Sequence, residues 1–153
     1  MWPFYLREHF TKVVTFEPDP LNCGCLCLNT AGMGIEAYQS ALGAQRGWAK
    51  VQRWTTERTN AGAGYVVPGG EIPVIAIDDL RLRFCDLLLL DVEGSELDVL
   101  LGAYLTIQKS RPVVVIEEKK LPQGGDYLAP RRFLESMGYQ EAVKIHRDVV
   151  FTC

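Results

Sequence analysis

The fold of this chain is decided by the stretch Cys85-Asp-Leu-Leu-Leu-Leu-Asp-Val-Glu-Gly-Ser-Glu96. Its four consecutive leucines end at Asp91, and a short continuous apolar run of this kind is typical of a central parallel strand covered on both faces. Gly94 permits a tight turn shortly afterwards. The stretch therefore predicts a buried strand that leads, through a short acidic loop, into a helix.

The predicted helix runs to about Lys109. Ser95 and Asp98 have the spacing of a capping box at its start. Apolar residues then recur at the three- and four-residue intervals that place side chains on one helix face. The residues expected to face the core are Leu97, Leu100, Leu101, Tyr104 and Leu105.

Strand and helix patterns alternate on either side of this unit. Strands are expected at 12–16, 35–42, 48–54, 66–67, 74–77, 112–117, 139–145 and 149–153, and helices at 4–10, 21–31, 80–84 and 130–137. The segments 35–42 and 48–54 are candidates for a hairpin. The alternation predicts an α/β, doubly wound sheet that is mostly parallel and ends in an antiparallel C-terminal strand pair.

Composition and charge exclude several classes of protein. The chain has 153 residues, which predicts a single domain over 1–153. Its net charge is −3 and it has no basic stripe, so we expect no nucleic-acid partner. The longest apolar run, 87–90, is too short to cross a membrane, and no secretion signal is recognisable, so we expect a cytoplasmic protein.

Five cysteines include a Cys23-x-Cys25-x-Cys27 run. An odd count without a secretion signal favours free thiols in a reducing compartment. If the run is helical, alternate side chains point about 200° apart, which is poor geometry for one ion. We therefore expect no metal site.

Polar side chains follow the expected strands at the edge where open α/β sheets bind ligands. They are Glu17 and Asp19, Gln39 and Ser40, Asp91 and Glu93, and Glu117 and Glu118. Carboxylates repeated at strand ends indicate a ligand site. Glu17 can accept hydrogen bonds from both ribose hydroxyls of a nucleotide-like cofactor, or it can simply favour the start of the next helix. Asp91 and Glu93 can orient a substrate, or can cap the following helix.

Motifs along nearly the whole chain resemble the FkbM methyltransferase family. Besides Asp86 to Glu96 they are Thr15-Phe-Glu-Pro-Asp-Pro20, Ser40-Ala-Leu-Gly43, Asn60-Ala-Gly62, Ile77-Asp-Asp-Leu80, Val99-Leu-Leu-Gly-Ala103, Arg111-Pro-Val-Val-Val-Ile-Glu117 and Phe133-Leu-Glu-Ser-Met-Gly-Tyr139. The resemblance implies a Rossmann-like methyltransferase sheet and S-adenosylmethionine as cofactor. It also implies methylation of a hydroxyl on a sugar, other glycan or small metabolite.

The resemblance also implies roles for single residues. Glu17, with Pro18 and Asp19, would hold the cofactor's ribose, and Ser40 and Ala41 would lie near its adenine. Asp91 would lie where cofactor and substrate meet, together with Glu93. The candidates for a catalytic base are Asp91, Glu93 and Glu117.

Two departures from the family pattern have consequences. The family's first strand, glycine-rich cofactor loop and helix are missing, and Leu89 stands where many relatives have a lysine. Without the first strand, we expect the strands ending at Glu17 and Asp91 to pair directly, or their open edges to be covered by another copy of the chain or by a partner chain. A truncated gene product, a non-catalytic assembly subunit and a different α/β nucleotide-binding enzyme stay as alternatives. For the last of these we find no Walker loop, nucleophile elbow or zinc motif.

Overall fold

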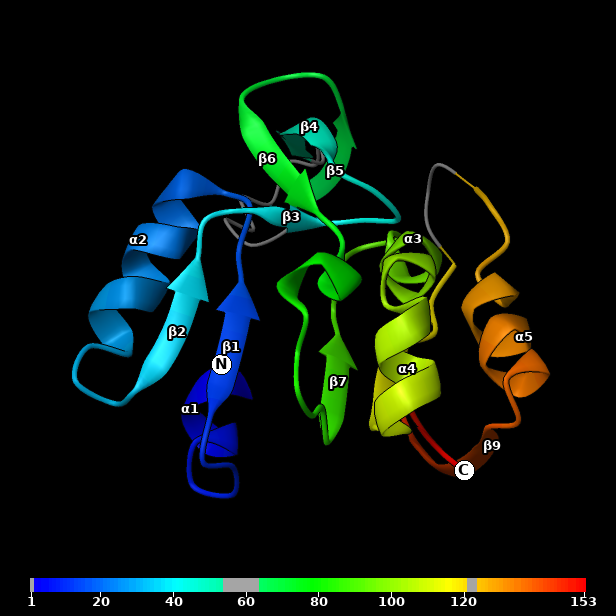
Figure 1. The fold of residues 1–153 in the computed structure, drawn as a ribbon. Coiled ribbons are helices and arrows are strands. Elements are labelled where there is room, and N and C mark those ends of the chain that lie inside the picture. The colour runs from blue at the N-terminus through cyan, green and yellow to red at the C-terminus, as the bar shows by residue number, and fades with distance from the viewer. Residues whose placement is uncertain (1, 54–63, 121–123) are drawn as a thin grey trace. The chain divides into compact units, whose positions relative to one another are not determined.

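The computed structural model describes residues 2–53, 64–120 and 124–153. The chain forms two compact units. The first unit comprises residues 1–41 and 47–74, and the second comprises residues 42–46 and 75–153. Figure 1 shows the helices and strands of both units. Each unit is described by itself. The single domain expected over 1–153 stays a prediction, and the predicted motif at Asn60 lies outside the described residues.

The first unit combines a parallel strand pair with a small antiparallel sheet. Its helices are α1 (Trp2–Leu6) and α2 (Pro20–Asn29), and its strands are β1 (Val13–Phe16), β2 (Ile35–Tyr38), β4 (Gly47–Arg53) and β5 (Gly64–Pro68). Strand β3 (Ala41–Leu42) and strand β6 (Ile72–Ile75) lie at the border with the second unit. β1 pairs in parallel with β2, and the antiparallel strands β6 and β5 flank β4.

The sequence Glu17-Pro-Asp-Pro20 ends β1 and begins α2, as predicted. Asp19 is the N-cap of α2, where its Oδ1 accepts hydrogen bonds from the backbone N–H of Leu21 at 2.9 Å and of Asn22 at 3.1 Å. Pro20 occupies the first turn, where a missing N–H is harmless. These bonds fix the course of the chain directly after β1.

The second unit contains a four-stranded mixed sheet. Its elements are the 3₁₀ helix η1 (Ile77–Leu80), β7 (Leu87–Leu90), α3 (Glu96–Gly102), α4 (Tyr104–Ser110), β8 (Val113–Glu117), α5 (Ala129–Ser136), β9 (Gln140–Ile145) and β10 (Asp148–Thr152). The strand order is β7-β8-β10-β9. β7 and β8 are parallel, whereas β10 is antiparallel to both of its neighbours, which confirms the predicted C-terminal pair.

One face of this sheet forms the core of the second unit. Side chains at alternate strand positions are buried against residues of the helices. The strand residues are Leu88, Leu90, Val114, Ile116, Val149 and Phe151, and the helix residues are Val99, Leu100, Ile107 and Leu134. Residues of the opposite face, such as Leu89 and Val115, are only half-buried. The helices of this unit pack on one face, and the coverage of β7 on its other face stays a prediction.

The predicted single parallel sheet is also corrected. The described strands form three small sheets, and only β1–β2 and β7–β8 are parallel. The segment 35–42 is not one strand, since Ser40 N–H bonds to the Tyr38 carbonyl and turns the chain between β2 and β3. The hairpin expected with 48–54 is wrong, because β4 pairs with β5 and β6. β1 lies in the first unit and β7 in the second, and the expectation that these strands pair directly or are covered by another chain stays a prediction.

The predicted long helix is broken at Ala103 into α3 and α4. Leu101, Tyr104 and Leu105 are exposed, whereas Ala103 and Ile107 join the core. Ser95 is the N-cap of α3 but makes no side-chain cap bond, so the predicted capping box does not form. None of the described helices is both long and apolar enough to cross a membrane.

The expected helix at 80–84 is replaced by η1, which contains Asp78 and Asp79. Asp78 does act as a cap, but for a different helix. Its carboxylate accepts hydrogen bonds from the backbone N–H groups of Leu105 at 2.9 Å and Thr106 at 2.8 Å, at the start of α4. Asp78 is separated from Leu105 by 27 positions and from Thr106 by 28, so a local sequence pattern cannot predict this cap.

Candidate functional site

In the first unit, Glu17 and Ser40 follow the two strands of the parallel pair. Phe16 lies opposite Tyr38 in the register of β1 and β2. The backbone N–H groups of Glu17 and Ser40 both donate to the carbonyl oxygen of Tyr38, each at 3.1 Å. The shared acceptor ties the two strand ends together. The carboxyl ends of the two strands therefore bring Glu17 and Ser40 together from segments that are separate in the sequence.

Glu17 and Asp19 have different surroundings. The half-buried Glu17 accepts a hydrogen bond at Oε1 from the Asp19 N–H at 2.9 Å, which fixes the orientation of its carboxylate across Pro18. Asp19 is buried, caps α2 and bonds to Arg53 Nη2 at 2.8 Å. Burial acts to raise the pKa of Asp19, but the Asn22 N–H and the Arg53 guanidinium outweigh it, and the pKa is lowered. Asp19 therefore stabilises the local structure through the cap of α2 and the bond to Arg53, whereas Glu17 lies directly after β1.

The side-chain oxygen of Ser40 is buried and has no hydrogen-bond partner within the part of the chain that the structure describes. Its Oγ is the one buried side-chain oxygen or nitrogen, among the described residues, that lacks a hydrogen-bond partner. Ser40 is 5% exposed and is followed by Ala41, which is also buried. A buried hydroxyl without a partner costs about 1–3 kcal/mol, so native proteins rarely retain one without a use for it.

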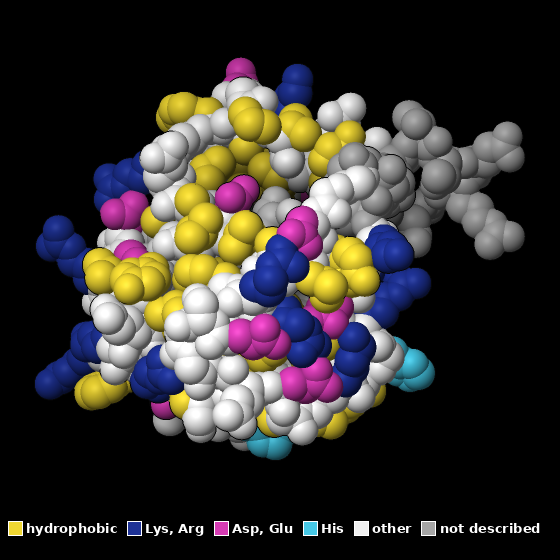
Figure 2. All heavy atoms as spheres, turned by 90° about the vertical axis from the view of Figure 1, so that its right-hand side faces the viewer, with side chains coloured by type: hydrophobic (Ala, Val, Ile, Leu, Met, Phe, Trp, Pro, Cys, Tyr) yellow, Lys and Arg dark blue, Asp and Glu magenta, His cyan; other side chains and the backbone are white. Residues whose placement is uncertain are grey.

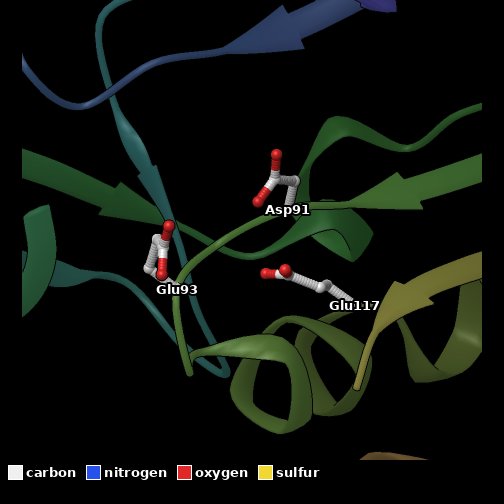
Figure 3. A group of neighbouring side chains, drawn as sticks. All are labelled: Asp91, Glu93 and Glu117. Carbon is white, nitrogen blue, oxygen red and sulfur yellow. The ribbon is translucent and has the colours of Figure 1, made fainter. Parts of the chain in front are cut away.

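In the second unit, Asp91, Glu93 and Glu117 form a carboxylate cluster (Figure 3). One oxygen of each lies within 4.8 Å of the others. Glu117 ends β8, and Asp91 and Glu93 follow β7, so the parallel register that sets Leu90 opposite Ile116 brings the next residues together. Asp91 is exposed, and Glu93 and Glu117 are half-buried. The structure therefore brings together the three predicted catalytic candidates.

Lys119 contributes a cation that sequence reasoning did not include. Its Nζ lies 2.6 Å from Glu93 Oε2 and 2.7 Å from Glu117 Oε2. Leu89 stands where many relatives have a lysine, and Lys119 supplies a cation to these carboxylates from another segment. A signal was present, because residues two apart at a strand end point to the same side, as Glu117 and Lys119 do.

The loop between β7 and α3 holds Glu93 in an unusual backbone conformation. Glu93 has φ of 50° and Gly94 has φ of 100°. The left-handed region costs a non-glycine residue about 1–2 kcal/mol, so the loop must be held by other contacts. One is the Lys119 ion pair, and another is a hydrogen bond from the Gly94 N–H to Glu96 Oε1 at 3.2 Å. Glu93 is thus bound to Lys119 and does not cap α3.

Electrostatics distinguish Asp91 within the cluster. Burial is the largest influence that raises its pKa, followed by the negative charges of Glu117 and Glu93. The positive charge of Lys119 acts in the opposite direction, and Asp148 adds a smaller rise. Because Asp91 is exposed, solvent moderates the effect. The net result is a carboxyl group whose affinity for a proton is above the ordinary value.

The remaining carboxylate at a strand end, Glu118, forms ion pairs with two basic residues. It is buried and accepts bonds from Arg131 Nε and Lys144 Nζ, both at 2.7 Å. Figure 2 shows basic and acidic side chains interspersed on one face of the molecule, in keeping with ion pairs of this kind. Glu118 points to a different set of partners from Glu117 and lies outside the carboxylate cluster.

Comparison with known proteins shows the family. The profile of the Methyltransferase FkbM domain family matches residues 4–141. The chain belongs to the FkbM methyltransferase domain family. In fold, it is similar to the crystal structure of the methyltransferase FkbM from Methylobacillus flagellatus KT, with a TM-score of 0.63 and 21% identity. The match covers 93% of this chain and 36% of that one, so the chain spans about a third of that protein's length. No curated protein matches the chain.

Membership of the FkbM family implies a methyl donor, and the first unit fits the nucleoside part of S-adenosylmethionine. The oriented carboxylate of Glu17 is suited to two neighbouring hydroxyls, and Ser40 Oγ is a buried hydroxyl in need of a partner. The loop from β1 to α2 is Glu17-Pro-Asp19 and contains no glycine. The fit therefore concerns the ribose and adenine end.

Proposed function

We propose that this chain is an S-adenosylmethionine-dependent methyltransferase that acts on a hydroxyl group of a sugar, other glycan or small metabolite. The observation that carries the proposal is the pairing of an oriented carboxylate with a buried, unpartnered hydroxyl at the carboxyl edge of a parallel strand pair. This edge is where open α/β sheets bind nucleotide-like cofactors. Family membership supports the same assignment.

In this proposal, the first unit binds the nucleoside part of the cofactor. Glu17 accepts hydrogen bonds from the two ribose hydroxyls, in an orientation fixed by the Asp19 N–H. Ser40 Oγ bonds to the adenosine part, which satisfies the buried hydroxyl. Ala41 lies buried beside it and provides a small apolar contact. Pro18 and Asp19 support the segment, with Asp19 engaged by α2 and Arg53.

In the second unit, the carboxylate cluster is the candidate for acid–base chemistry. S-adenosylmethionine provides a methyl group on a positively charged sulfur. When bound, this cofactor would supply the methyl, and an acceptor hydroxyl would need a base for the proton that it loses; the carboxylates of the cluster are groups of that kind. The cluster offers three such groups, in Asp91, Glu93 and Glu117.

A thermal unfolding experiment tests the proposal through Ser40. S-adenosylhomocysteine should raise the Tm of the wild-type chain, because a ligand that binds the native state stabilises it. Ser40→Ala should unfold at a higher temperature than the wild type without ligand, since it removes an unsatisfied buried hydroxyl. The same variant should show a smaller ligand-induced rise. An unchanged wild-type Tm at saturating ligand would refute the cofactor assignment.

A row of apolar residues, half-buried on the inner strands and exposed on β9, favours a second candidate function, that of an assembly subunit. On the sheet face away from the core, Leu89, Val115, Val150 and Val143 lie in one cross-strand row. Val143 is 46% exposed and Ile145, on the outer strand β9, is 59% exposed. Apolar surface on an edge strand is typical of association. We propose a second copy of the chain as the partner; light scattering that gives a monomer would exclude it.

A further inference from the structure

The segment between β1 and α2 offers a single backbone donor to the Glu17 carboxylate. In Pro18-Asp19-Pro20 neither proline carries a backbone N–H, so the amide of Asp19 is the only one in this tripeptide. It donates to Glu17 Oε1 at 2.9 Å. The orientation of the Glu17 carboxylate therefore depends on how firmly Asp19 is held.

Asp19 is held through both oxygens of its side chain. Oδ1 accepts from the backbone N–H groups of Leu21 and Asn22 at the start of α2. Oδ2 accepts from Arg53 Nη2 at 2.8 Å. The Asp19 side chain is only 10% exposed, whereas that of Arg53 is 49% exposed. Because the bond is charge-assisted and its acceptor is buried, Arg53 contributes to fixing Asp19 in place.

Arg53 reaches Asp19 from a distant part of the first unit. It is the last residue of β4, which pairs with β5 and β6 in the antiparallel sheet. The two partners of the ion pair are 34 positions apart in the sequence. The ion pair therefore ties the end of β4 to the segment that carries Glu17.

Ser40 gives an independent reason to expect a ligand at this strand end. Among the described residues, its Oγ is buried without a hydrogen-bond partner, and the residue is 5% exposed. Its N–H shares the carbonyl oxygen of Tyr38 with the N–H of Glu17. A buried hydroxyl in this state is typical of a site that a ligand completes. All of these residues, Arg53 and Asp19 included, belong to the first unit.

We propose that Arg53 is a positioning residue for Glu17: by pairing with Asp19, it holds the amide that orients the Glu17 carboxylate toward the ribose hydroxyls of S-adenosylmethionine. This inference rests on the proposed function and adds a residue to its cofactor site. Arg53 acts through Asp19 and Glu17 and not on the cofactor itself. Because solvent weakens an ion pair with a half-exposed partner, loss of Arg53 should cost less affinity than loss of Glu17.

Calorimetric titration with S-adenosylhomocysteine tests how Arg53 acts. Arg53→Met should weaken binding about three- to fivefold. Asp19→Asn keeps the helix cap but loses the ion pair, so it should weaken binding by a similar factor. Arg53→Lys keeps the positive charge and should restore part of the affinity. In Glu17→Ala, which has no carboxylate to orient, adding Arg53→Met should have no further effect. An equal loss in both backgrounds would overturn the proposal.

Lys12→Met is the matched control. Lys12 belongs to the same unit and also pairs with a carboxylate, that of Glu36 at 2.9 Å, but it precedes β1 and so lies at the opposite end of the strand pair. Its replacement should leave the affinity unchanged. A loss equal to that of Arg53→Met would show an unspecific effect of removing a positive charge and would also overturn the proposal.

A second measurement needs no cofactor. Hydrogen exchange of the Asp19 amide, followed by NMR, reports directly on its bond to Glu17. Arg53→Met should speed this exchange severalfold, and Lys12→Met should leave it unchanged. Unchanged exchange in Arg53→Met would overturn the proposal even where S-adenosylhomocysteine binds. Faster exchange in a chain that does not bind S-adenosylhomocysteine would instead count against the proposed function and leave the positioning of Glu17 intact.

Discussion

The carbonyl oxygen of Gly43 packs against the α-carbon of Gly102, so closely that a Cβ added at Gly102 would lie 2.1 Å from that oxygen. Both residues belong to the second unit, with Gly43 in the segment after β3 and Gly102 at the end of α3. The contact joins two backbones, and neither can yield as a flexible side chain would. This close approach explains why glycine stands at the position where α3 ends.

Gly102→Ala should destabilise the chain by about 2–3 kcal/mol, because the added methyl group forces backbone atoms apart. Urea unfolding measures the change. Gly24→Ala is the control: it is also a helical glycine, but nothing lies within 4 Å of an added Cβ. This control should stabilise by about 0.5–1 kcal/mol through helix propensity. Equal effects of the two substitutions would contradict the proposed packing.

Glu118 should make stability depend on acid pH. Burial acts to raise its pKa, but the bonds from Arg131 and Lys144 outweigh it and lower the pKa below the ordinary 4.5. Its stabilisation is therefore complete above pH 4.5 and is lost as the pH falls through the lower, folded value. Glu118→Gln should cost about 2 kcal/mol at pH 7 and flatten the acid limb of the unfolding curve. An unchanged acid limb would contradict the assignment.

Two substitutions at Asp19 can separate the contribution of its helix cap to stability from that of its ion pair with Arg53. Asp19→Asn keeps an oxygen that can accept from the N–H groups of Leu21 and Asn22, so only the bond to the half-exposed Arg53 is lost. The expected loss is below about 1 kcal/mol. Asp19→Ala removes the cap as well and should cost about 1 kcal/mol more. Chemical denaturation of the two variants, beside Arg53→Ala, measures both contributions; equal losses would show that the cap is unimportant.

The five thiols should react at two rates. Cys25, Cys27 and Cys153 are exposed, whereas Cys23 is buried and Cys85 is half-buried. Burial raises the pKa of Cys23 and raises that of Cys85 to about 11, so both carry little thiolate at pH 8. A thiol reagent at pH 8 should modify three residues quickly, and all five after unfolding. Fast modification of Cys85 in the folded chain would be inconsistent with its burial.

Local patterns predicted the strand ends of the site well. The proline pair around Asp19 and the leucine run before Asp91 mark where β1 and β7 end, because prolines and continuous apolar runs act within a few residues. The grouping of Asp91 with Glu117 also followed, since carboxyl ends of neighbouring parallel strands meet at one edge.

Contacts between segments that are distant in the sequence could not be predicted from local sequence patterns. The break at Ala103 accompanies the packing of Gly102 on Gly43, 59 residues earlier, as 102 − 43 gives. Similarly, Asp78 caps α4 from a distant segment. The Lys119 bridge to Glu93 depends on the left-handed turn at Glu93, which no residue type in the loop except Gly94 signals. Each miss thus stems from a contact between segments remote in sequence.

The most direct test of the central claim is calorimetric titration of S-adenosylhomocysteine into the wild-type chain, Glu17→Gln and Glu36→Gln. Glu36 is the control, since it lies on β2 and pairs at the surface with Lys12. The wild type and Glu36→Gln should bind alike, and Glu17→Gln should bind about 10- to 100-fold more weakly, because charge-assisted bonds to the ribose are lost. Absence of wild-type binding, or equal affinity of all three proteins, would contradict the cofactor site at Glu17.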